Sequence, residues 1–207
     1  MLMSDLKQHY QTLFAKHGSH HHAVQYSAKQ SQFASFRILL QNLQLNDSIL
    51  DIGCGLGDML AFLRTEMNFI GHYKGLDFVP EFIQAAKQRF ADDSHAEFEE
   101  FNLNTSALPE GYSLVVLAGV FNNLMDDNES FMNSTIKNMY KASNSKVAFN
   151  ALSTYVDYQD ESLYYYDPLK VFDFCKRELS SKVTLRHDYC VKENSIPFEF
   201  SIYLYKG

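Results

Sequence analysis

The chain has 207 residues, 46% of them hydrophobic and 21% charged, which is ordinary for one globular domain. A formal net charge of −7 argues against a nucleic-acid partner, because affinity for a phosphate backbone depends on clustered Lys and Arg. No apolar run reaches the roughly 20 residues of a membrane span, and residues 1–10 lack an apolar signal segment. We therefore expect a cytoplasmic protein that does not bind membranes.

Helices and strands are predicted to alternate along the chain with short connections. Apolar periodicity and capping signals predict helices over residues 2–17, 31–43, 58–67, 80–90, 128–143 and 168–179. Strands are predicted over residues 48–52, 73–77, 96–101, 112–118, 146–152, 183–189 and 198–205. This order is typical of an α/β fold with one mostly parallel sheet, and the alternating pattern of the last strand indicates an antiparallel edge.

The first predicted strand ends in a glycine-rich turn. Ile49, Leu50 and Ile52 indicate a buried strand, and Gly53, Gly55 and Gly57 follow directly, before a helix that begins at Asp58. Glycines allow a sharp turn with no Cβ between the backbone and a ligand. A strand, a glycine turn and a helix N-terminus together predict a ligand site at one corner of the sheet.

The spacing of this turn argues against a dinucleotide. A dinucleotide site has the pattern Gly-x-Gly-x-x-Gly, whereas here the third glycine comes one residue early and Asp58 follows it. An acidic residue at that point repels a diphosphate, and Asp51 is suited to accept a hydrogen bond from an ammonium group. These features favour a cationic nucleoside without phosphate.

Residues 50–57, LDIGCGLG, resemble the first motif of the class I S-adenosylmethionine-dependent methyltransferases. The resemblance implies a Rossmann-like seven-stranded sheet with helices on both faces, and it covers nearly the whole chain. It also implies that S-adenosylmethionine is the cofactor. We expect a helical lid over residues 1–45 and the cofactor-binding domain over residues 46–207.

The resemblance assigns cofactor contacts to the ends of several strands. The turn residues Gly53, Cys54, Gly55 and Gly57 would approach the methionine and ribose, and Asp51 would hold the amino group. Asp77 stands twenty residues after Gly57, at a strand end where its carboxylate can accept hydrogen bonds from both ribose hydroxyls. Further expected cofactor contacts are Phe78, Asn102, Leu103, Ala118, Gly119 and Phe121. A turn-forming role is an equally good interpretation of Asn102. For Phe78 and Leu103, the sequence alone does not distinguish a contact with adenine from a place in the core.

The residues at the end of the fourth strand exclude some classes of methyltransferase. It lacks the Asp/Asn-Pro-Pro-Tyr/Phe motif of adenine and glutamine-amide N-methyltransferases, and Leu117 stands where metal-dependent relatives carry an acid. We therefore expect no catalytic metal. Asn122 is predicted to face the acceptor, with a plain loop role as the alternative.

The segment before the first strand resembles the lid of a subgroup of these enzymes found with polysaccharide and small-molecule biosynthesis genes. In that subgroup Tyr10, His17, Gly18 and Gln32 would fold over the cofactor, within a stretch that includes Tyr26. The triplet at residues 20–22 is interpreted as an exposed lid loop and not as a metal site, because three adjacent side chains cannot all converge on one ion.

Aromatic and polar residues after the fifth and sixth strands are candidates for the acceptor site. Asn150, Tyr155 and Tyr165 would line a pocket for a small molecule or glycan, although a structural loop packed by tyrosines is equally compatible. His187 is the candidate general base because its pKa suits neutral pH, with a packed histidine as the alternative.

The sequence thus predicts metal-independent methyl transfer, with oxygen favoured over nitrogen as the acceptor atom. A non-catalytic S-adenosylmethionine-binding subunit that docks a partner through its tyrosines is the alternative. A nicotinamide-dependent oxidoreductase is disfavoured by the glycine spacing and by Asp58.

Overall fold

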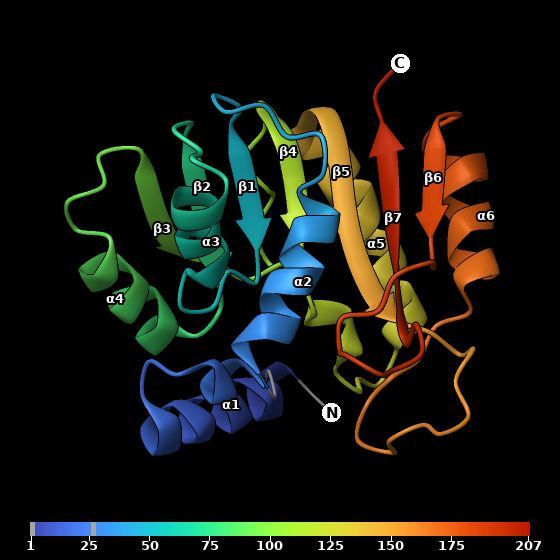
Figure 1. Cartoon of the computed structure of the whole chain (residues 1–207), viewed down its shortest axis with the longest axis horizontal. Coiled ribbons are helices and arrows are strands. Elements are labelled where there is room, and N and C mark those ends of the chain that lie inside the picture. Colours follow the sequence, from blue (N-terminus) through green and yellow to red (C-terminus); the bar gives the residue numbers. More distant parts are fainter. Residues whose placement is uncertain (1–2, 26–27) are drawn as a thin grey trace.

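A computed structural model describes residues 3–25 and 28–207. A seven-stranded sheet with the order β3-β2-β1-β4-β5-β7-β6 forms its centre (Figure 1). The strands are β1 (Ile49–Ile52), β2 (Tyr73–Asp77), β3 (Ala96–Glu100), β4 (Tyr112–Leu117), β5 (Ser143–Leu152), β6 (Val183–Arg186) and β7 (Glu199–Tyr205). The helices are α1 (Met3–His17), α2 (Lys29–Leu39), α3 (Asp58–Glu66), α4 (Pro80–Arg89), α5 (Asn128–Ala142) and α6 (Pro168–Glu178), with short 3-10 helices η1 (His21–Val24) and η2 (Val120–Asn122).

The strand directions confirm a mostly parallel sheet with an antiparallel last strand, but the prediction that this strand is an edge is wrong, because β6 pairs with β7 on its outer side. Strands β3, β2, β1, β4 and β5 pair in parallel, and β7 runs antiparallel to both β5 and β6. The chain moves outward from β1 to β2 and β3, and then returns to place β4 on the other side of β1. The strand order therefore reverses at β1, and ligands of open α/β sheets bind beside such a reversal at the carboxyl ends of the strands.

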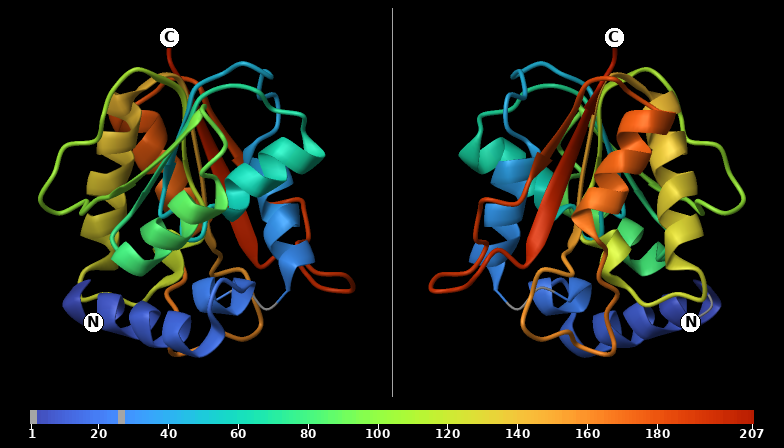
Figure 2. Two further views of the ribbon diagram at one scale, coloured as in Figure 1. Left: turned by 90° about the vertical axis from the view of Figure 1, so that its left-hand side faces the viewer. Right: turned by 90° about the vertical axis from the view of Figure 1, so that its right-hand side faces the viewer.

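Alternate residues of the central strands pack against helices on opposite faces. Leu50 and Ile52 lie in a cluster with side chains of α5 and α6, whereas Ile49 lies in a cluster with side chains of α2, α3 and α4. Figure 2 shows α2 and α3 on one side of the sheet and α5 and α6 on the other. Because both faces are covered, these strands are apolar almost without interruption, as parallel strands generally are.

Two predicted elements end three or four residues later than the observed ones. The second helix ends at Leu39 instead of residue 43, and Asn42 adopts a left-handed conformation with φ of 61°. The sixth strand ends at Arg186 instead of residue 189, where its ladder with β7 reaches Ser201. Beyond that point the Tyr189 side chain turns inward, and its hydroxyl lies 2.6 Å from Ser201 Oγ.

The N-terminal segment lies across the carboxyl ends of the central strands (Figure 1). Tyr10 and Phe14 of α1 pack with Phe82 of α4 and with Val24 of η1 in a separate apolar cluster. Tyr26, which the predicted lid includes, lies outside the described residues. In the described part of the chain, none of the helices is long and apolar enough to span a membrane.

Candidate functional site

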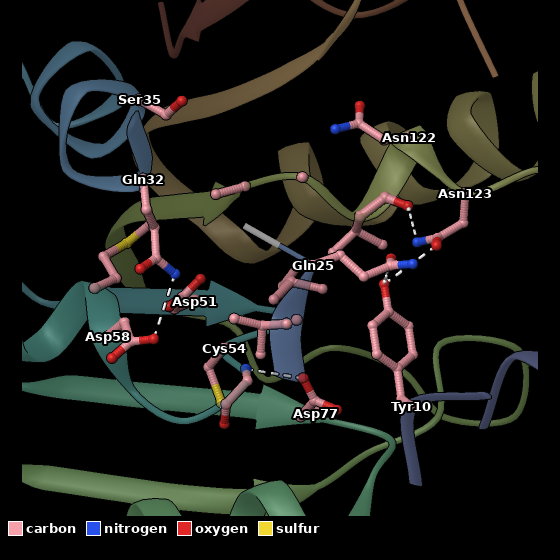
Figure 3. A pocket seen from close by; sticks show the side chains of 18 of the residues that line it. Tyr10, Gln25, Gln32, Ser35, Asp51, Cys54, Asp58, Asp77, Asn122 and Asn123 are labelled. Atoms are coloured by element: carbon pink, nitrogen blue, oxygen red, sulfur yellow. Dashed lines mark hydrogen bonds between the residues drawn. The ribbon is translucent and has the colours of Figure 1, made fainter. Parts of the chain in front are cut away.

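A cavity of about 340 Å³ opens at the carboxyl ends of β1, β2 and β4 (Figure 3). Residues of α1 and η1 form part of its lining. We call the part formed by Gln32, residues 51–56, Asp58 and residues 76–78 the turn end. The opposite part, here called the far end, is formed by Asn122, Met125, Phe131, Leu152, Leu163, Val191, Lys192, Phe198 and Glu199.

The predicted glycine turn connects β1 to α3. Gly53, Gly55 and Gly57 all have positive φ, at 74°, 53° and 75°. The backbone N–H groups of Gly53 and Cys54 both donate to Leu76 O, at 2.8 and 3.0 Å, which ties the turn to the end of β2. A Cβ on Gly55 would lie 2.9 Å from Val24 Cγ1, so η1 approaches the turn as closely as a glycine permits.

Asp77 is held at the end of β2 by backbone donors. Its Oδ2 accepts from Gly55 N and its Oδ1 from Val79 N, both at 2.9 Å (Figure 3). Burial raises the pKa of Asp77 to about 6, against the lowering effect of these bonds. Each carboxylate oxygen has a second lone-pair site, so Asp77 can still accept hydrogen bonds from a ligand.

Asp51 is a second buried carboxyl group at the turn end. Its Oδ2 accepts a hydrogen bond of 2.5 Å from the hydroxyl of Tyr73. Burial raises the pKa of Asp51 to about 7, the Tyr73 bond opposes this rise, and the charge of Asp77 adds to it. A ligand that carries positive charge would favour the ionised form of both carboxyl groups.

Gln32 of α2 extends the turn end from the other side. Its Nε2 donates to Asp58 Oδ2 at 3.3 Å, and Asp58 Oδ1 also binds Arg89 at 2.7 Å. The buried Oε1 of Gln32 has no hydrogen-bond partner among the described residues. A buried acceptor without a partner costs free energy, so this atom is suited to a donor group of a ligand.

The N-terminal segment reaches the cavity through Tyr10. Its hydroxyl lies 2.9 Å from Gln25 Oε1 and 3.2 Å from Asn123 Oδ1, which links α1 to the segment after η2 (Figure 3). His20 and His22 of the triplet are exposed. Among the described residues, no group of three or more His, Cys, Asp or Glu side chains is arranged to hold a metal ion.

Most of the predicted cofactor residues line this cavity: Gln32, Asp51, Gly53, Cys54, Gly55, Asp77, Phe78, Leu103, Ala118 and Gly119. Gly57, Asn102 and Phe121 lie elsewhere. Gly57 faces the Phe90 and Phe98 rings, Asn102 accepts a turn bond from Asn104 N at 2.9 Å, and Phe121 is fully buried in the core.

The predicted acceptor residues are spread over a wider area. Asn122 lines the far end, and its Oδ1 accepts from Leu152 N at 3.2 Å. Asn150 lies behind the cavity wall, where its Oδ1 accepts from Gly119 N at 2.9 Å. Tyr155 is 57% exposed, and the Tyr165 hydroxyl accepts a bond from Asp160 N within the same loop. Neither tyrosine is part of the cavity wall.

His187 lies just beyond β6, away from the cavity lining. Its ring packs against Tyr155, with centroids 6.0 Å apart, and against Phe200 at 6.4 Å. Its buried Nε2 has no hydrogen-bond partner among the described residues. These contacts are those of a packed histidine, and its role as a base stays a prediction.

Sequence reasoning missed Glu199, the buried carboxyl group of the far end. It opens β7, is 6% exposed and accepts from Ser35 Oγ at 2.9 Å and from the Tyr189 hydroxyl at 3.2 Å. The sequence did contain an indication of this site. An acid at the first position of a mostly apolar strand is unusual unless it has hydrogen-bond partners or a ligand.

Comparisons with known proteins agree with this geometry. A sequence profile described as a methyltransferase domain matches residues 50–144. Rv1506c of Mycobacterium tuberculosis, which carries a provisional methyltransferase name, is 34% identical over 155 residues, which are 72% of this chain and 90% of that protein.

Solved structures share the fold at low sequence identity. Magnesium protoporphyrin IX methyltransferase (ChlM) from Synechocystis PCC 6803, with bound S-adenosylhomocysteine, has a TM-score of 0.66 at 10% identity and covers 97% of this chain and 94% of its own. An S-adenosylmethionine-dependent methyltransferase from Clostridium acetobutylicum ATCC 824 has a TM-score of 0.63 at 13% identity, with 96% and 99% covered. The motif, the sheet order and the 34% identical relative together show that this chain belongs to the class I S-adenosylmethionine-dependent methyltransferases.

Proposed function

We propose that this enzyme methylates a hydroxyl oxygen of a small-molecule or glycan-type acceptor without a catalytic metal. The observation that carries the proposal is one continuous cavity. It has buried carboxyl groups and an amide oxygen without a hydrogen-bond partner among the described residues at the turn end, and a separate wall at the far end. One cavity can therefore hold a cofactor and an acceptor side by side.

The residues of the turn end fit S-adenosylmethionine. Asp77 has free lone-pair sites for the ribose hydroxyls, and Asp51 and Gln32 Oε1 are suited to accept from the ammonium group. Phe78 and Leu103 would lie against the adenine. When bound, the cofactor supplies a methyl group on a cationic sulfur.

The chain itself would contribute mainly by positioning. Holding two reactants in line at about 3–3.5 Å can contribute about 7–11 kcal/mol, so a strong base is not required. The end of β4 supports a mechanism without a metal, since Leu117 is buried and Ala118 and Gly119 line the cavity where an acidic ligand would be needed. We also propose that residues 1–45 act as a lid, on the basis of the cavity contacts of Tyr10, Val24 and Gln25.

Two measurements test the proposal. Calorimetry should detect binding of S-adenosylhomocysteine and no binding of NAD. Incubation with methyl-labelled cofactor and a panel of hydroxyl acceptors should release S-adenosylhomocysteine, and mass spectrometry should find one added methyl mass on the acceptor. Binding of NAD in preference to S-adenosylhomocysteine would contradict the assignment.

A non-catalytic role is the second candidate, favoured by the exposed tyrosines. Tyr158 is 78% exposed and Tyr155 is 57% exposed, both in the loop between β5 and α6. A surface of this kind is typical of a docking site. Binding of the cofactor without release of S-adenosylhomocysteine, for any acceptor tested, would favour this role.

A further inference from the structure

The far end is a mostly apolar chamber assembled from segments distant in sequence. Leu152 N donates to Asn122, Asn123 pairs with Leu163, and Ser153 N donates to Phe198 O. These contacts bring together the end of β5, the segment after η2, and the loops before α6 and β7. The apolar side chains that face the cavity here are Met125, Phe131, Leu152, Leu163, Val191 and Phe198.

Glu199 is the buried carboxyl group in this apolar wall. It stands opposite Leu152 in the β5–β7 ladder, at the point where both strands meet the cavity. Burial raises the pKa of Glu199, while hydrogen bonds from Ser35, Asn150 and Tyr189 lower it. A carboxylate can accept about four hydrogen bonds, and these three donors leave one site for a ligand.

The position of Glu199 relates it to both parts of the cavity. Asn150 forms a hydrogen bond with Glu199 and also accepts one from the backbone N–H of Gly119, which lines the cavity. Ser35 comes from α2, the helix that also carries Gln32. Glu199 is therefore held by hydrogen bonds to residues that also contact the cavity-lining segment at Gly119 and the helix that carries Gln32.

We propose, on the basis of the methyltransferase function proposed above, that the acceptor is an apolar aromatic alcohol of the phenol or naphthol type, whose hydroxyl group is bound by Glu199. In the transfer, the hydroxyl oxygen bonds to the methyl carbon, and the carbon–sulfur bond of the cofactor breaks with its electron pair on sulfur. The hydroxyl proton passes to the Glu199 carboxylate.

A sugar fits this chamber less well than an aromatic alcohol. A sugar carries several hydroxyl groups, and each one left without a partner in a buried site costs about 1–3 kcal/mol. The polar side chains on this side of the cavity are Asn122, Asn123, Glu199 and the exposed Lys192. Asn122 Oδ1 is already bonded to Leu152 N, and the Asn123 amide is bonded to the Tyr10 hydroxyl and to Val120 O. An aromatic alcohol needs one polar partner and contacts apolar walls with the rest of its surface.

Binding to the protein saturated with S-adenosylhomocysteine is the first test. Calorimetry should show that 2-naphthol binds at least about tenfold more tightly than methyl glucoside. In Glu199→Gln the affinity for 2-naphthol should fall about tenfold, because a charge-assisted hydrogen bond is replaced by a neutral one. Affinity for S-adenosylhomocysteine should change by less than about twofold.

Turnover is the second test. With methyl-labelled cofactor, 2-naphthol should gain one methyl mass, and Glu199→Gln should lower kcat about 100-fold, as expected for loss of a general base. Glu193→Gln is the matched control, since Glu193 is an exposed carboxylate in the loop before β7 and should leave both readouts unchanged. If Glu199→Gln does not fold, Glu199→Asp replaces it as the test variant. Its side chain keeps the charge but is shorter by one methylene, so it should also weaken 2-naphthol binding.

The outcomes separate this inference from the proposed function. Tighter binding of methyl glucoside than of 2-naphthol would overturn the inference while leaving methyl transfer intact. The same holds if both Glu199 variants keep the affinity and the kcat of the parent enzyme for 2-naphthol. Binding of 2-naphthol that depends on Glu199, without transfer to any acceptor, would support the acceptor site and count against the proposed function. Failure of S-adenosylhomocysteine to bind would overturn both.

Discussion

At the turn end of the cavity most of the polar groups come from two short stretches, residues 51–58 and 77–78, whereas at the far end Asn122 and Glu199 come from segments distant in the chain. The turn end is also held by backbone groups, because the N–H groups of Gly53, Cys54 and Gly55 all donate hydrogen bonds to residues at the end of β2. The far end consists mainly of side chains that project from loops. A backbone-built site holds one ligand and tolerates little change, while a wall of loop side chains can vary with the acceptor.

The largest expected effect is at Asp77. Asp77→Ala should weaken binding of S-adenosylhomocysteine more than about 100-fold, because charge-assisted hydrogen bonds contribute about 1.5–3 kcal/mol each and two are expected. The variant also removes the acceptor of Gly55 N and Val79 N. Calorimetry measures the loss, and the exposed Asp92→Ala is the control. Equal affinity in both variants would mean that the turn end does not hold the ribose.

The pH dependence of the turn end should have opposite signs for stability and for binding. The pKa of Asp51 is about 7 and that of Asp77 about 6 when folded, both above the value of about 3.9 for an unfolded Asp. The folded state therefore holds more protons, so these groups add stability below about pH 4 that is lost as pH rises to 7.

Cofactor binding should strengthen over the same range, because the ammonium group of the ligand and its ribose hydroxyls bind best to ionised carboxylates. Affinity for S-adenosylhomocysteine should rise at least about tenfold from pH 5.5 to 7.5. Thermal denaturation with and without the ligand measures both trends. Asp51→Asn should flatten each of them, and a profile identical to that of the parent protein would exclude Asp51 as the titrating group.

A smaller effect is expected where the lid meets the turn. Gly55→Ala combines a left-handed φ of 53° with a Cβ 2.9 Å from Val24 Cγ1, and should lower the free energy of unfolding by about 1–2 kcal/mol or more. Adding Val24→Ala should remove the steric part and leave the backbone strain. Gly18→Ala is the matched control, since Gly18 has φ of 59° but no atom within 4 Å of the added Cβ. Equal denaturation midpoints for the two single variants would show that the lid contact does not matter.

The smallest effect is expected at His187. His187→Gln should leave kcat and the acceptor KM within about threefold of the parent enzyme, because the ring packs on Tyr155 and Phe200 outside the cavity lining. Loss of a general base would instead lower turnover by about 100-fold or more. A loss of that size in His187→Gln, but not in Glu199→Gln, would reverse the assignment of the far end.

The fold and the turn end could be predicted because their signals are local. A strand followed by closely spaced glycines requires a turn, and Asp77 comes at the end of the next strand, so parallel pairing of β1 with β2 brings the two together. The strand directions were confirmed for the same reason, since continuous apolar runs mark strands covered on both faces. The end of β6 was placed wrongly because the inward turn of Tyr189 depends on Ser201 of a later strand.

The sequence by itself determined the family, the sheet and most of the residues that line the turn end, because all of these follow from periodicity and from a motif that is contiguous in the chain. Only the tertiary structure decided which side chains share the far end. Glu199, Ser35 and Asn150 are brought together by the β5–β7 ladder and by the packing of α2 on the sheet. Contacts between residues so far apart in sequence leave no spacing pattern, and they exist only because burial of the apolar strands brings these segments together.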